Sequence, residues 1–548
     1  MIDTWSVELT SGFPMGAGIQ LRSPEPGRIT FFAPWDTSPR PLWYNFHVRG
    51  QMNRRVRFEL QNADQCLGGP MGYRQCHVYP VYTTDDPSLP PSQRRWHRVE
   101  SEALSYRDGV YAFEIDVYAD QITVAHCYPY GLEELQEFLN EHHNNAMLRS
   151  DTSCVSSMGN GVPRLRIGKH HETPVIWITA RIHAGEVSGS WALDGLLRWL
   201  LSGQHAAKWL LEHYQFHVFP LFDIDGVLSG WYGKERAPFD FNRSWLADSS
   251  WQEISALLKE FFSPEYESAL LLDFHSPRAQ DPNHIFLPIA ETMPESQWKF
   301  CTDLSAAIAR ESPINAHLTP GNIRTPTYMG YECASNIDGV GAMVMGIPTI
   351  CLEVSYGYLD ASGGAVMALK DYHDFGAATG RALAATLKAS PDAARKISQP
   401  TPLCHTKPTR DYAGTSFRGC IPWSPPHAAT VKSQTENGME KLVMEFDCAE
   451  ASIDMALPPL QISGSYRYCL DVQSSNQPMH MAVTFLGIAD SGLWLRWTAK
   501  ADVTIFPSPQ ARRLEFKLAP PAEVRYVQAS LMISGGPARF VVAPPLWI

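Results

Sequence analysis

Long hydrophobic segments are missing from this 548-residue chain: no apolar run approaches the roughly 18 residues that a membrane-spanning helix needs. The first residues, MIDTWSVELTSGFPMG, contain neither the basic stretch nor the apolar core of a secretory signal, so no signal peptide is expected. Internal repeats and low-complexity blocks are absent as well. The sequence therefore predicts a soluble cytoplasmic protein that has no membrane partner.

Closely spaced cysteine pairs are also missing. The eleven cysteines are scattered between Cys66 and Cys469 and form no CxxC pair, so unpaired thiols in a reducing compartment are expected. An excess of basic charge is absent too, since 45 Lys and Arg residues against 57 Asp and Glu residues give a formal net charge of −12. This balance argues against a nucleic-acid partner or an anionic membrane surface, because both favour a basic protein.

The chain does contain enough apolar residues for several cores. A hydrophobic content of 44% is typical of globular proteins, and the length favours roughly two to four domains. Residues 1–131 predict an N-terminal β-rich domain, because aromatic and branched residues partly alternate in segments such as RRVRFELQN and GVYAFEIDV. Residues 396–548 comprise a linker and recurrent β-type segments separated by turns, which predicts a C-terminal domain resembling a β-sandwich.

The central segment, residues 132–395, alternates short apolar runs with helical patterns. It opens with a predicted helix over residues 132–148, and its apolar runs are PVIWITA, YQFHVFPLF, ALLLDF and IPTICLEV. A stripe of leucines between Leu193 and Leu201 predicts a helix directly after the first run. The alternation predicts an α/β catalytic domain in which a mixed, mostly parallel sheet is flanked by helices.

Polar side chains follow each of these runs, at the carboxyl ends of the predicted strands, where open α/β sheets carry their chemistry. In chain order they are His183 and Glu186, Asp223 and Asp225, His275, and Glu353. Two histidines and one carboxylate form a known catalytic zinc set that leaves a fourth position for water. We therefore expect His183, Glu186 and His275 to bind one Zn²⁺ per catalytic domain. An HxxE pair alone is weak evidence for a site, because a core histidine and a glutamate at a helix N-terminus explain it more simply.

In the order of its motifs the chain resembles the zinc metallocarboxypeptidase family, and within it the cytosolic-carboxypeptidase-like branch. The motifs are HAGE (183–186), DIDGV (223–227), DFNRSW (240–245), DFHSP (273–277) and CLEVS (351–355). The resemblance covers roughly residues 132–390, and the segment LWYNFHVRG is similar to the β domain that precedes the catalytic unit in that branch. The region beyond about residue 400 has no recognised counterpart.

The resemblance implies a role for each matched position. The three metal-site residues would bind zinc, and Glu353 would act as general base toward a zinc-activated water. Asn242 and Arg243 would hold the terminal carboxylate of a peptide or protein substrate. Asp240 would orient a ligand histidine. The implied activity is the hydrolysis of C-terminal residues from peptides or protein tails.

Two positions depart from the family pattern. The turn reads DIDG where the family usually has NPDG, so Asp223 stands in place of an asparagine. Gly233 lies nine residues before Asn242, where the cytosolic branch has the arginine that polarises the scissile carbonyl. Arg236 and Lys234 are nearby alternatives, and Arg236 is preferred because its fork of donors suits a developing oxyanion.

The family also uses a mobile tyrosine upstream of the general base, and a residue before that base sets the preferred terminal side chain. The sequence offers alternatives for both. Tyr331 lies 22 residues before Glu353 and is the first candidate for the tyrosine, with Tyr328 as the alternative. Asp338 lies 15 residues before Glu353 and would suit a basic terminal side chain, although in IDG it is more simply a turn residue. The cytosolic branch often removes glutamate, which would require a cation in the pocket. Candidates for that cation are Arg324, Lys234 and Arg236.

Two other functions are compatible with these residues. One is an N-acyl amino-acid deacylase or amidase on the same fold, against which the Asn242–Arg243 pair favours a peptidase. The other is an inactive binding protein that uses its C-terminal domain, and against it stands the intact ligand set. The aromatic residues that such a binding surface would use are Trp423, Trp494 and Trp497.

Overall fold

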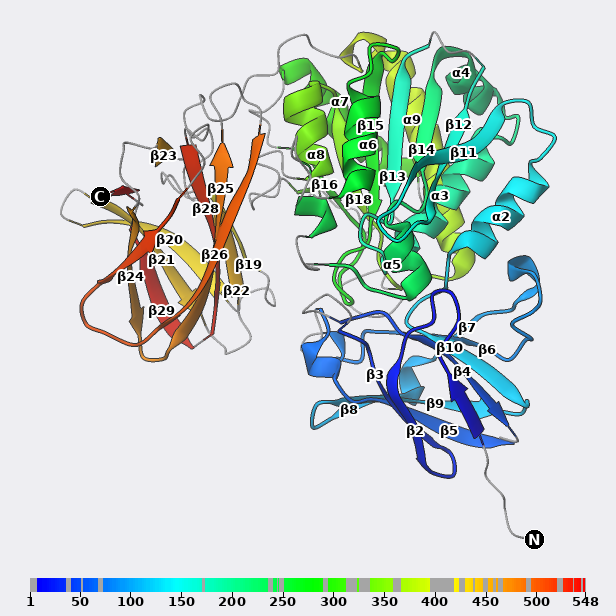
Figure 1. The fold of residues 1–548 in the computed structure, drawn as a ribbon, viewed down its shortest axis with the longest axis horizontal. Helices are drawn as coiled ribbons and strands as arrows, with labels where there is room; N and C mark the ends of the chain where they lie inside the picture. Colours follow the sequence, from blue (N-terminus) through cyan, green and yellow to red (C-terminus); the bar gives the residue numbers. More distant parts are fainter. Residues whose placement is uncertain are drawn as a thin grey trace.

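The structure is a computed structural model. The residues that it describes form five β-sheets, and helices surround the central one. Figure 1 shows the two N-terminal sheets against one end of a central α/β unit and the two C-terminal sheets at its side. The structure describes residues 7–35, 41–50, 53–67, 72–169, 173–234, 240–243, 245, 251–288, 294–311, 323–324, 336–357, 366–394, 418–422, 429–436, 439–446, 452–456, 460–461, 467–488, 494–519, 526–535, 537–543 and 546–547.

The N-terminal part consists of two five-stranded sheets with an aromatic core between them. Alternation places Phe31, Phe46, Phe58 and Phe113 inside, with ring centroids 4.8 Å apart for Phe31 and Phe46. One sheet has the order β1 (Val7–Thr10), β4 (Asn45–Gly50), β10 (Gln121–Ala125), β6 (Val81–Thr83) and β7 (His97–Arg98). The other has the order β2 (Ile19–Glu25), β3 (Arg28–Phe32), β5 (Arg54–Leu60), β9 (Val110–Val117) and β8 (Leu104–Arg107). Short 3₁₀ helices connect them: η1 (Ala63–Gln65), η2 (Pro91–Gln93) and η3 (Ser101–Ala103).

The central unit is a mixed eight-stranded sheet, as predicted for the α/β domain. Its order is β11 (Leu148–Val155), β12 (Gly161–Ile167), β14 (Gln215–Phe219), β13 (Val175–Ala180), β15 (Ser268–His275), β18 (Thr349–Glu353), β16 (His284–Phe286) and β17 (Ile323–Arg324). Strands β14, β13, β15 and β18 are parallel, and β11, β12 and β16 are antiparallel to their inner neighbours. Every residue of β13 and β15 is buried, which is why these strands read as continuous apolar runs.

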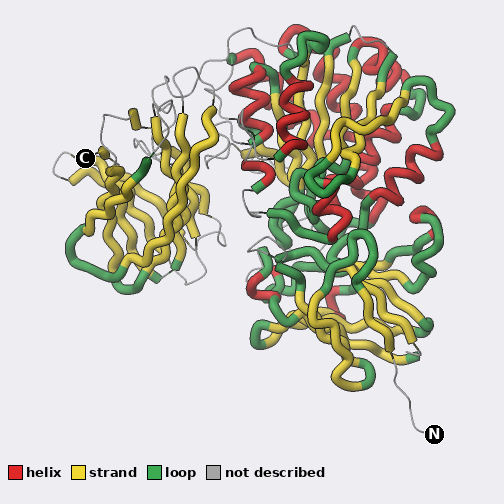
Figure 2. The backbone as a smooth tube through the Cα atoms, in the orientation of Figure 1, coloured by secondary structure: helices red, strands yellow, loops and turns green. Residues whose placement is uncertain are grey.

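The two flanking parts consist of strands and loops with a few short helical turns, whereas helices surround this sheet (Figure 2). They are α2 (Leu132–Glu141), α3 (Val187–Leu200), α4 (His205–His213), α5 (Ile224–Ser229), η4 (Phe241–Arg243), α6 (Gln252–Phe261), α7 (Glu295–Glu311), α8 (Ile337–Gly339), the π-helical η8 (Val340–Met345), α9 (Leu369–Ala389) and η9 (Pro391–Ala393). The predicted helix over residues 132–148 is wrong at its C-terminal end. It stops at Glu141, and turn residues lead from there into β11, because Asn145 accepts a bond from the backbone N–H of Met147 and favours a turn.

Helices α3 and α9 approach each other closely through glycines. A Cβ atom at Gly376 would lie 1.9 Å from the carbonyl oxygen of Ala192, and one at Gly380 would lie 2.3 Å from the ring of Trp199. Larger residues at these positions would force the two helices apart. The turn that leads into α3 carries two of the expected metal ligands, so this contact helps to hold them against the sheet.

The N-terminal part and the central unit share one continuous apolar core, which extends from Met15 to Ala394. Arg98 of β7 crosses the boundary between them: its Nε donates to the carbonyl oxygen of Met367 at 2.7 Å, and an Nη donates to the hydroxyl of Tyr372 at 3.0 Å. The backbone N–H of Met15 donates to the carbonyl oxygen of Leu228 in α5 at 3.2 Å. The two parts are therefore packed against each other as one body.

The C-terminal part contains two six-stranded antiparallel sheets with a core of their own. One consists of β19 (Arg418–Pro422), β22 (Ser452–Ala456), β28 (Tyr526–Ser534), β25 (Met479–Ile488) and β26 (Trp494–Ile505), with β23 (Leu460–Gln461) beside β28. The other consists of β20 (Ala429–Glu436), β21 (Met439–Phe446), β29 (Ala538–Val542), β24 (Arg467–Ser475) and β27 (Arg512–Lys517), with β30 (Leu546–Trp547) beside β24. Side chains from both sheets, such as Leu470 and Leu531, meet in this second core.

Two further sequence expectations concern membranes and thiols. Of the helices that the structure describes, none combines the length and apolarity needed to cross a bilayer. The seven cysteines whose side chains it describes are all free.

Candidate metal centre

A tight turn after β13 presents the first two candidate ligands. Gly185 is tied to the next loop because its N–H donates to the carbonyl oxygen of Tyr232 at 2.9 Å. A Cβ atom at Gly185 would lie 2.7 Å from the ring of Tyr232, so no larger residue fits. The buried guanidinium of Arg181 donates from Nε to the carbonyl oxygen of Ala184 at 2.6 Å and thereby fixes the turn. Glu186 then begins α3 as its N-terminal cap residue.

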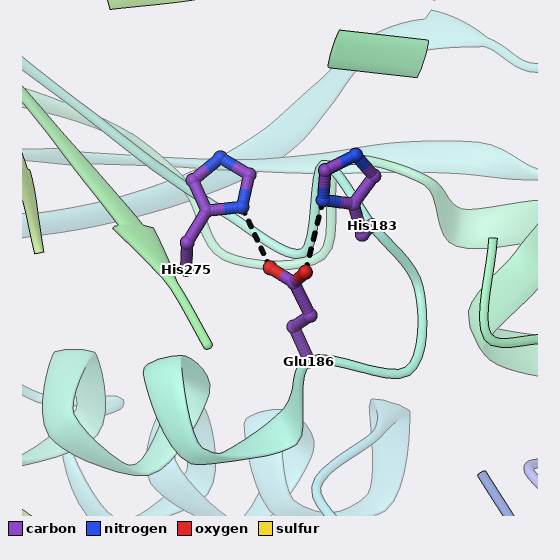
Figure 3. A group of neighbouring side chains, drawn as sticks. All are labelled: His183, Glu186 and His275. Atoms are coloured by element: carbon purple, nitrogen blue, oxygen red, sulfur yellow. Dashed lines mark hydrogen bonds and ion pairs between the residues drawn. The ribbon is translucent and has the colours of Figure 1, made fainter. Parts of the chain in front are cut away.

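His275 reaches the same place from the end of the adjacent parallel strand. Nδ1 of His183 lies 3.0 Å from Oε1 of Glu186, and Nδ1 of His275 lies 2.6 Å from Oε2 of the same carboxylate. Figure 3 shows both imidazoles converging on this carboxylate from opposite sides. One ligand atom from each of the three residues lies within 4.8 Å of the others, and all three side chains are buried.

A carboxylate oxygen lies beside the second nitrogen of each imidazole. Nε2 of His183 lies 3.1 Å from Oδ1 of Asp240, and Nε2 of His275 lies 2.7 Å from Oδ2 of Asp273. The other oxygen of Asp273 accepts a hydrogen bond from the hydroxyl of Thr179 at 2.7 Å. A carboxylate that accepts the Nε2 proton leaves Nδ1 as the lone-pair nitrogen, which is the arrangement of metal-binding histidines. The donor set of two imidazole nitrogens and one carboxylate therefore fits zinc.

The cluster is held together electrostatically. Burial by itself would raise the pKa of Glu186, but Lys234 and the two imidazoles outweigh burial and hold this pKa well below its usual value. Burial would lower the pKa of His275, yet Asp273 and Glu186 raise it well above the usual value. The carboxylate at the centre is thus ionised and attracts positive charge.

Lys234 comes from the loop after α5, and its Nζ lies 2.9 Å from Oε1 of Glu186. The sequence left open whether Lys234 or Arg236 would serve the site. The structure brings Lys234 to the ligand carboxylate, whereas Arg236 lies outside the described residues.

Glu353 ends β18, directly beside the strand of His275. The register pairs these two residues, and the N–H of Val354 donates to the carbonyl oxygen of His275 at 2.9 Å. Burial raises the pKa of Glu353 to about 6, against the opposing effect of Lys234 and His275. Among the described residues, no hydrogen-bond donor contacts its Oε2. A buried carboxylate with a free oxygen and a raised pKa suits proton transfer.

The expected substrate-binding residues are placed only in part. Asn242 is buried; its Nδ2 lies 3.1 Å from Nε2 of His275, and its Oδ1 accepts the N–H of Ile337 at 3.1 Å. Arg243 ends η4, but its side chain lies outside the described part of the chain. Tyr331 and the alternative Tyr328 also lie outside it.

The two aspartates of the DIDG turn serve the backbone. Oδ1 of Asp223 accepts the N–H of Gly226 at 3.0 Å and caps α5. Asp225 accepts the N–H of Met158 at 2.9 Å and so ties the β11–β12 hairpin to this turn. The departure from NPDG at position 223 is therefore compatible with a helix cap.

Two residues at the site had no assigned role in the sequence analysis. Asp273 and Cys351 each lie two residues before a candidate site residue on the same strand and hence on the same face. Asp273, His275 and Cys351 form a second group of possible ligands within 4.8 Å. The contact of Asp273 with Nε2 of His275 indicates that this carboxylate orients the imidazole. The period of two along a strand was the signal that could have identified Asp273.

A mixed α/β sheet with this ligand set at its carboxyl edge has the architecture of a zinc peptidase. The family model described as zinc carboxypeptidase matches residues 133–269, and the model described as cytosolic carboxypeptidase N-terminal domain matches residues 9–127. The chain thus contains one segment that is similar to zinc carboxypeptidases and one that is similar to the N-terminal domain of cytosolic carboxypeptidases. His275 and Glu353 lie beyond the matched segment.

Curated relatives agree with this assignment. Cytosolic carboxypeptidase 6 of Mus musculus is 27% identical over 268 residues, which are 45% of this chain and 48% of that protein. Cytosolic carboxypeptidase 2 of Danio rerio is 30% identical over 283 residues, which are 46% of this chain and 38% of that protein. The chain thus matches about half or less of the length of these relatives.

Solved structures share the fold. A metallo-carboxypeptidase from Burkholderia cenocepacia aligns with a TM-score of 0.58 at 21% identity, over 70% of this chain and 100% of that chain. A metallo-carboxypeptidase from Pseudomonas aeruginosa, in complex with (2-guanidinoethylmercapto)succinic acid, aligns with a TM-score of 0.58 at 18% identity, over 70% of this chain and 99% of that chain.

Proposed function

We propose that this chain is a zinc-dependent metallocarboxypeptidase that hydrolyses C-terminal residues from peptides or protein tails. The observation that carries the proposal is the convergence of His183, Glu186 and His275 within 4.8 Å, with Glu353 paired in register to His275. The matched family models and the relatives' names supply the reaction class.

His183, Glu186 and His275 would hold the zinc ion, one per catalytic domain, through Nδ1, carboxylate and Nδ1 atoms. Bound zinc supplies Lewis acidity and makes a water molecule more acidic. Asp240 and Asp273, which lie beside the two Nε2 atoms, would accept the Nε2 protons and so hold both imidazoles in the required orientation.

Glu353 would be the general base and then the general acid. Its buried carboxylate accepts one proton from the attacking water and delivers it to the nitrogen of the leaving amine. The pKa near 6 that burial produces keeps the carboxylate mostly ionised at neutral pH, while leaving the acid strong enough to give the proton back.

Asn242 and Arg243 would bind the terminal carboxylate of the substrate, which makes the enzyme an exopeptidase. A guanidinium binds a carboxylate with two parallel hydrogen bonds and so fixes the distance between the peptide end and the cleaved bond. Tyr331 would close over the substrate, and the carbonyl-polarising cation would come from Arg236 or Lys234, of which the sequence favours Arg236.

The same proposal includes the domain division 1–131, 132–395 and 396–548, the last being a linker and a β-sandwich domain. The two C-terminal sheets with a shared core support the sandwich. The names of the relatives support a cytoplasmic location. We propose no nucleic-acid or membrane partner, in keeping with the net charge of −12.

The relatives do not favour the two alternatives, a deacylase on the same fold and an inactive binding protein, since all those reported are named carboxypeptidases. Of the tryptophans that a binding surface would use, Trp423 lies outside the described residues, as do the side chains of Trp494 and Trp497.

A peptide-library experiment tests the proposal. The zinc-loaded protein is incubated with peptides that differ in their last residue, and mass spectrometry follows the loss of single C-terminal residues. N-acyl amino acids are offered in parallel to detect a deacylase. The matched control is Glu353→Gln, which changes one atom of the carboxylate. Ladder formation by the parent protein and not by the variant supports the proposal, whereas intact peptides with both proteins refute it.

A further inference from the structure

Lys234 brings a positive charge to the rim of the ligand cluster. Its Nζ lies 2.9 Å from Oε1 of Glu186; the lysine side chain is 22% exposed and the glutamate side chain is completely buried. Lys234 is also close enough to Glu353 to influence that carboxylate electrostatically. The ammonium group therefore contacts the ligand carboxylate of Glu186 and acts on Glu353 through its charge.

The backbone around Lys234 is built so that position 234, and not 233, presents a side chain. Gly233 has a φ of +84°, which is strained for any residue with a Cβ. A Cβ atom there would also lie 3.0 Å from the backbone nitrogen of Ala184. Because Tyr232 is hydrogen-bonded to Gly185 in the ligand turn, the loop keeps a fixed position relative to His183 and Glu186.

The other cation that influences Glu186 is held elsewhere. Arg181 is fully buried; its Nε donates to the carbonyl oxygen of Ala184 at 2.6 Å and one Nη donates to the carbonyl oxygen of Tyr130. Its guanidinium thus stabilises the turn and does not face an open side. Within the described part of the chain, Lys234 is the basic residue that forms an ion pair with a candidate ligand carboxylate.

We propose that Lys234 is a catalytic residue of the hydrolysis described above, on which this inference rests. Its ammonium donates a hydrogen bond to the carbonyl oxygen of the scissile bond and stabilises the negative charge that develops there. Glu186 is a ligand candidate as well as the partner of Lys234. If Glu186 held a metal ion, its ion pair with Lys234 would be weakened and the ammonium would be available to the substrate.

The hydrolysis transfers one water proton through Glu353 to the leaving amine. The water oxygen bonds to the carbonyl carbon while Glu353 takes one water proton, and the carbon–oxygen π pair moves onto the oxygen that faces Lys234. The pair then re-forms the double bond, the carbon–nitrogen bond breaks, and the amine leaves with the proton from Glu353. Lys234 remains an ammonium throughout and exchanges no proton.

Lys234→Met tests this role because it removes the charge and keeps the chain length, and Lys234→Arg restores a cation. The control is Lys299→Met, which removes a lysine with 71% exposure from the surface of α7. For each variant three quantities are measured: zinc affinity by competition with a chromogenic chelator, kcat and KM on the preferred library peptide, and the Kd of a phosphonate dipeptide analogue. The phosphonate carries a negative tetrahedral group and a free C-terminal carboxylate, so it responds to Lys234 without turnover.

Lys234→Met should lower kcat by about 10²–10³ and weaken phosphonate binding by a similar factor, with KM little changed. Zinc should bind as tightly as in the parent or more tightly, and Lys234→Arg should recover most of the loss. If Lys234→Met binds the phosphonate within about threefold of the parent, the proposed role is wrong. The role is also wrong if the loss of activity in Lys234→Met is fully explained by a loss of bound zinc. If the parent releases no terminal residue, the proposed function fails, and the phosphonate measurement still decides the role of Lys234. A parent that does not bind the phosphonate overturns the inference as well.

Discussion

Asp273 offers a sharp test of the metal centre, because it contacts a candidate ligand and does not bind the ion itself. Its Oδ2 lies 2.7 Å from Nε2 of His275, and its Oδ1 accepts the hydroxyl of Thr179 at 2.7 Å. Asp273→Asn keeps the size of the side chain and replaces one carboxylate oxygen by an NH₂ group. The imidazole then loses an ionic partner, and one of the two contacts loses its acceptor unless the threonine hydroxyl turns.

The expected size of the effect follows from this geometry. Asp273 is fully buried, so no water replaces the missing acceptor. Loss of such an orienting partner typically weakens metal binding by about 10–100-fold. This range corresponds to about 1.4–2.8 kcal/mol of zinc-binding free energy. Turnover at saturating zinc should fall less, because Glu353 remains in place.

The assay is a zinc titration in competition with a chelator of known affinity, with circular dichroism to establish that the fold is intact. Thr179→Val removes the other partner of Asp273 and leaves the carboxylate, so its zinc affinity should stay within about threefold of the parent. Asp303→Asn, at an exposed ion pair with Lys299, is the surface control. A zinc Kd for Asp273→Asn that equals that of the parent would refute the orienting role.

Four further outcomes are expected. His275→Ala should abolish stoichiometric zinc, measured by elemental analysis, and unchanged zinc content would remove this residue from the ligand set. Glu353→Gln should retain zinc and lower kcat by about 10²–10⁴, and near-normal turnover would exclude it as the base. The base works only when deprotonated, so kcat/KM should fall as the pH drops. Burial raises the pKa of Glu353 to about 6, and a bound cation lowers it, so this fall should occur at or below about pH 6. The same fall should be absent in Glu353→Gln. Gly376→Ala places a Cβ 1.9 Å from the carbonyl oxygen of Ala192 and should destabilise the protein by about 1–3 kcal/mol in thermal unfolding, whereas Gly12→Ala, with 3.8 Å of space, should change little.

Local patterns were sufficient for much of the fold. Continuous apolar runs such as VIWITA predicted strands buried on both faces, and the structure confirms the mixed sheet flanked by helices. The predicted helix over residues 132–148 extended too far, because an amphipathic pattern does not mark the residue at which a turn ends the helix. The β-rich character of the N-terminal part was readable from alternation, but its shared core with the central unit was not.

The sequence by itself determined which residue types stand at the ends of the parallel strands, because strand period and the His-x-x-Glu spacing are local properties of the chain. Only the tertiary structure decided how these residues meet. The two oxygens of Glu186 reach imidazoles from different elements, Asp273 holds one of them, and Lys234 occupies the rim while Asn242 contacts His275. These contacts depend on strand order, register and a glycine with positive φ. Distances through space between residues up to 89 positions apart in the chain are not encoded in any short stretch of sequence.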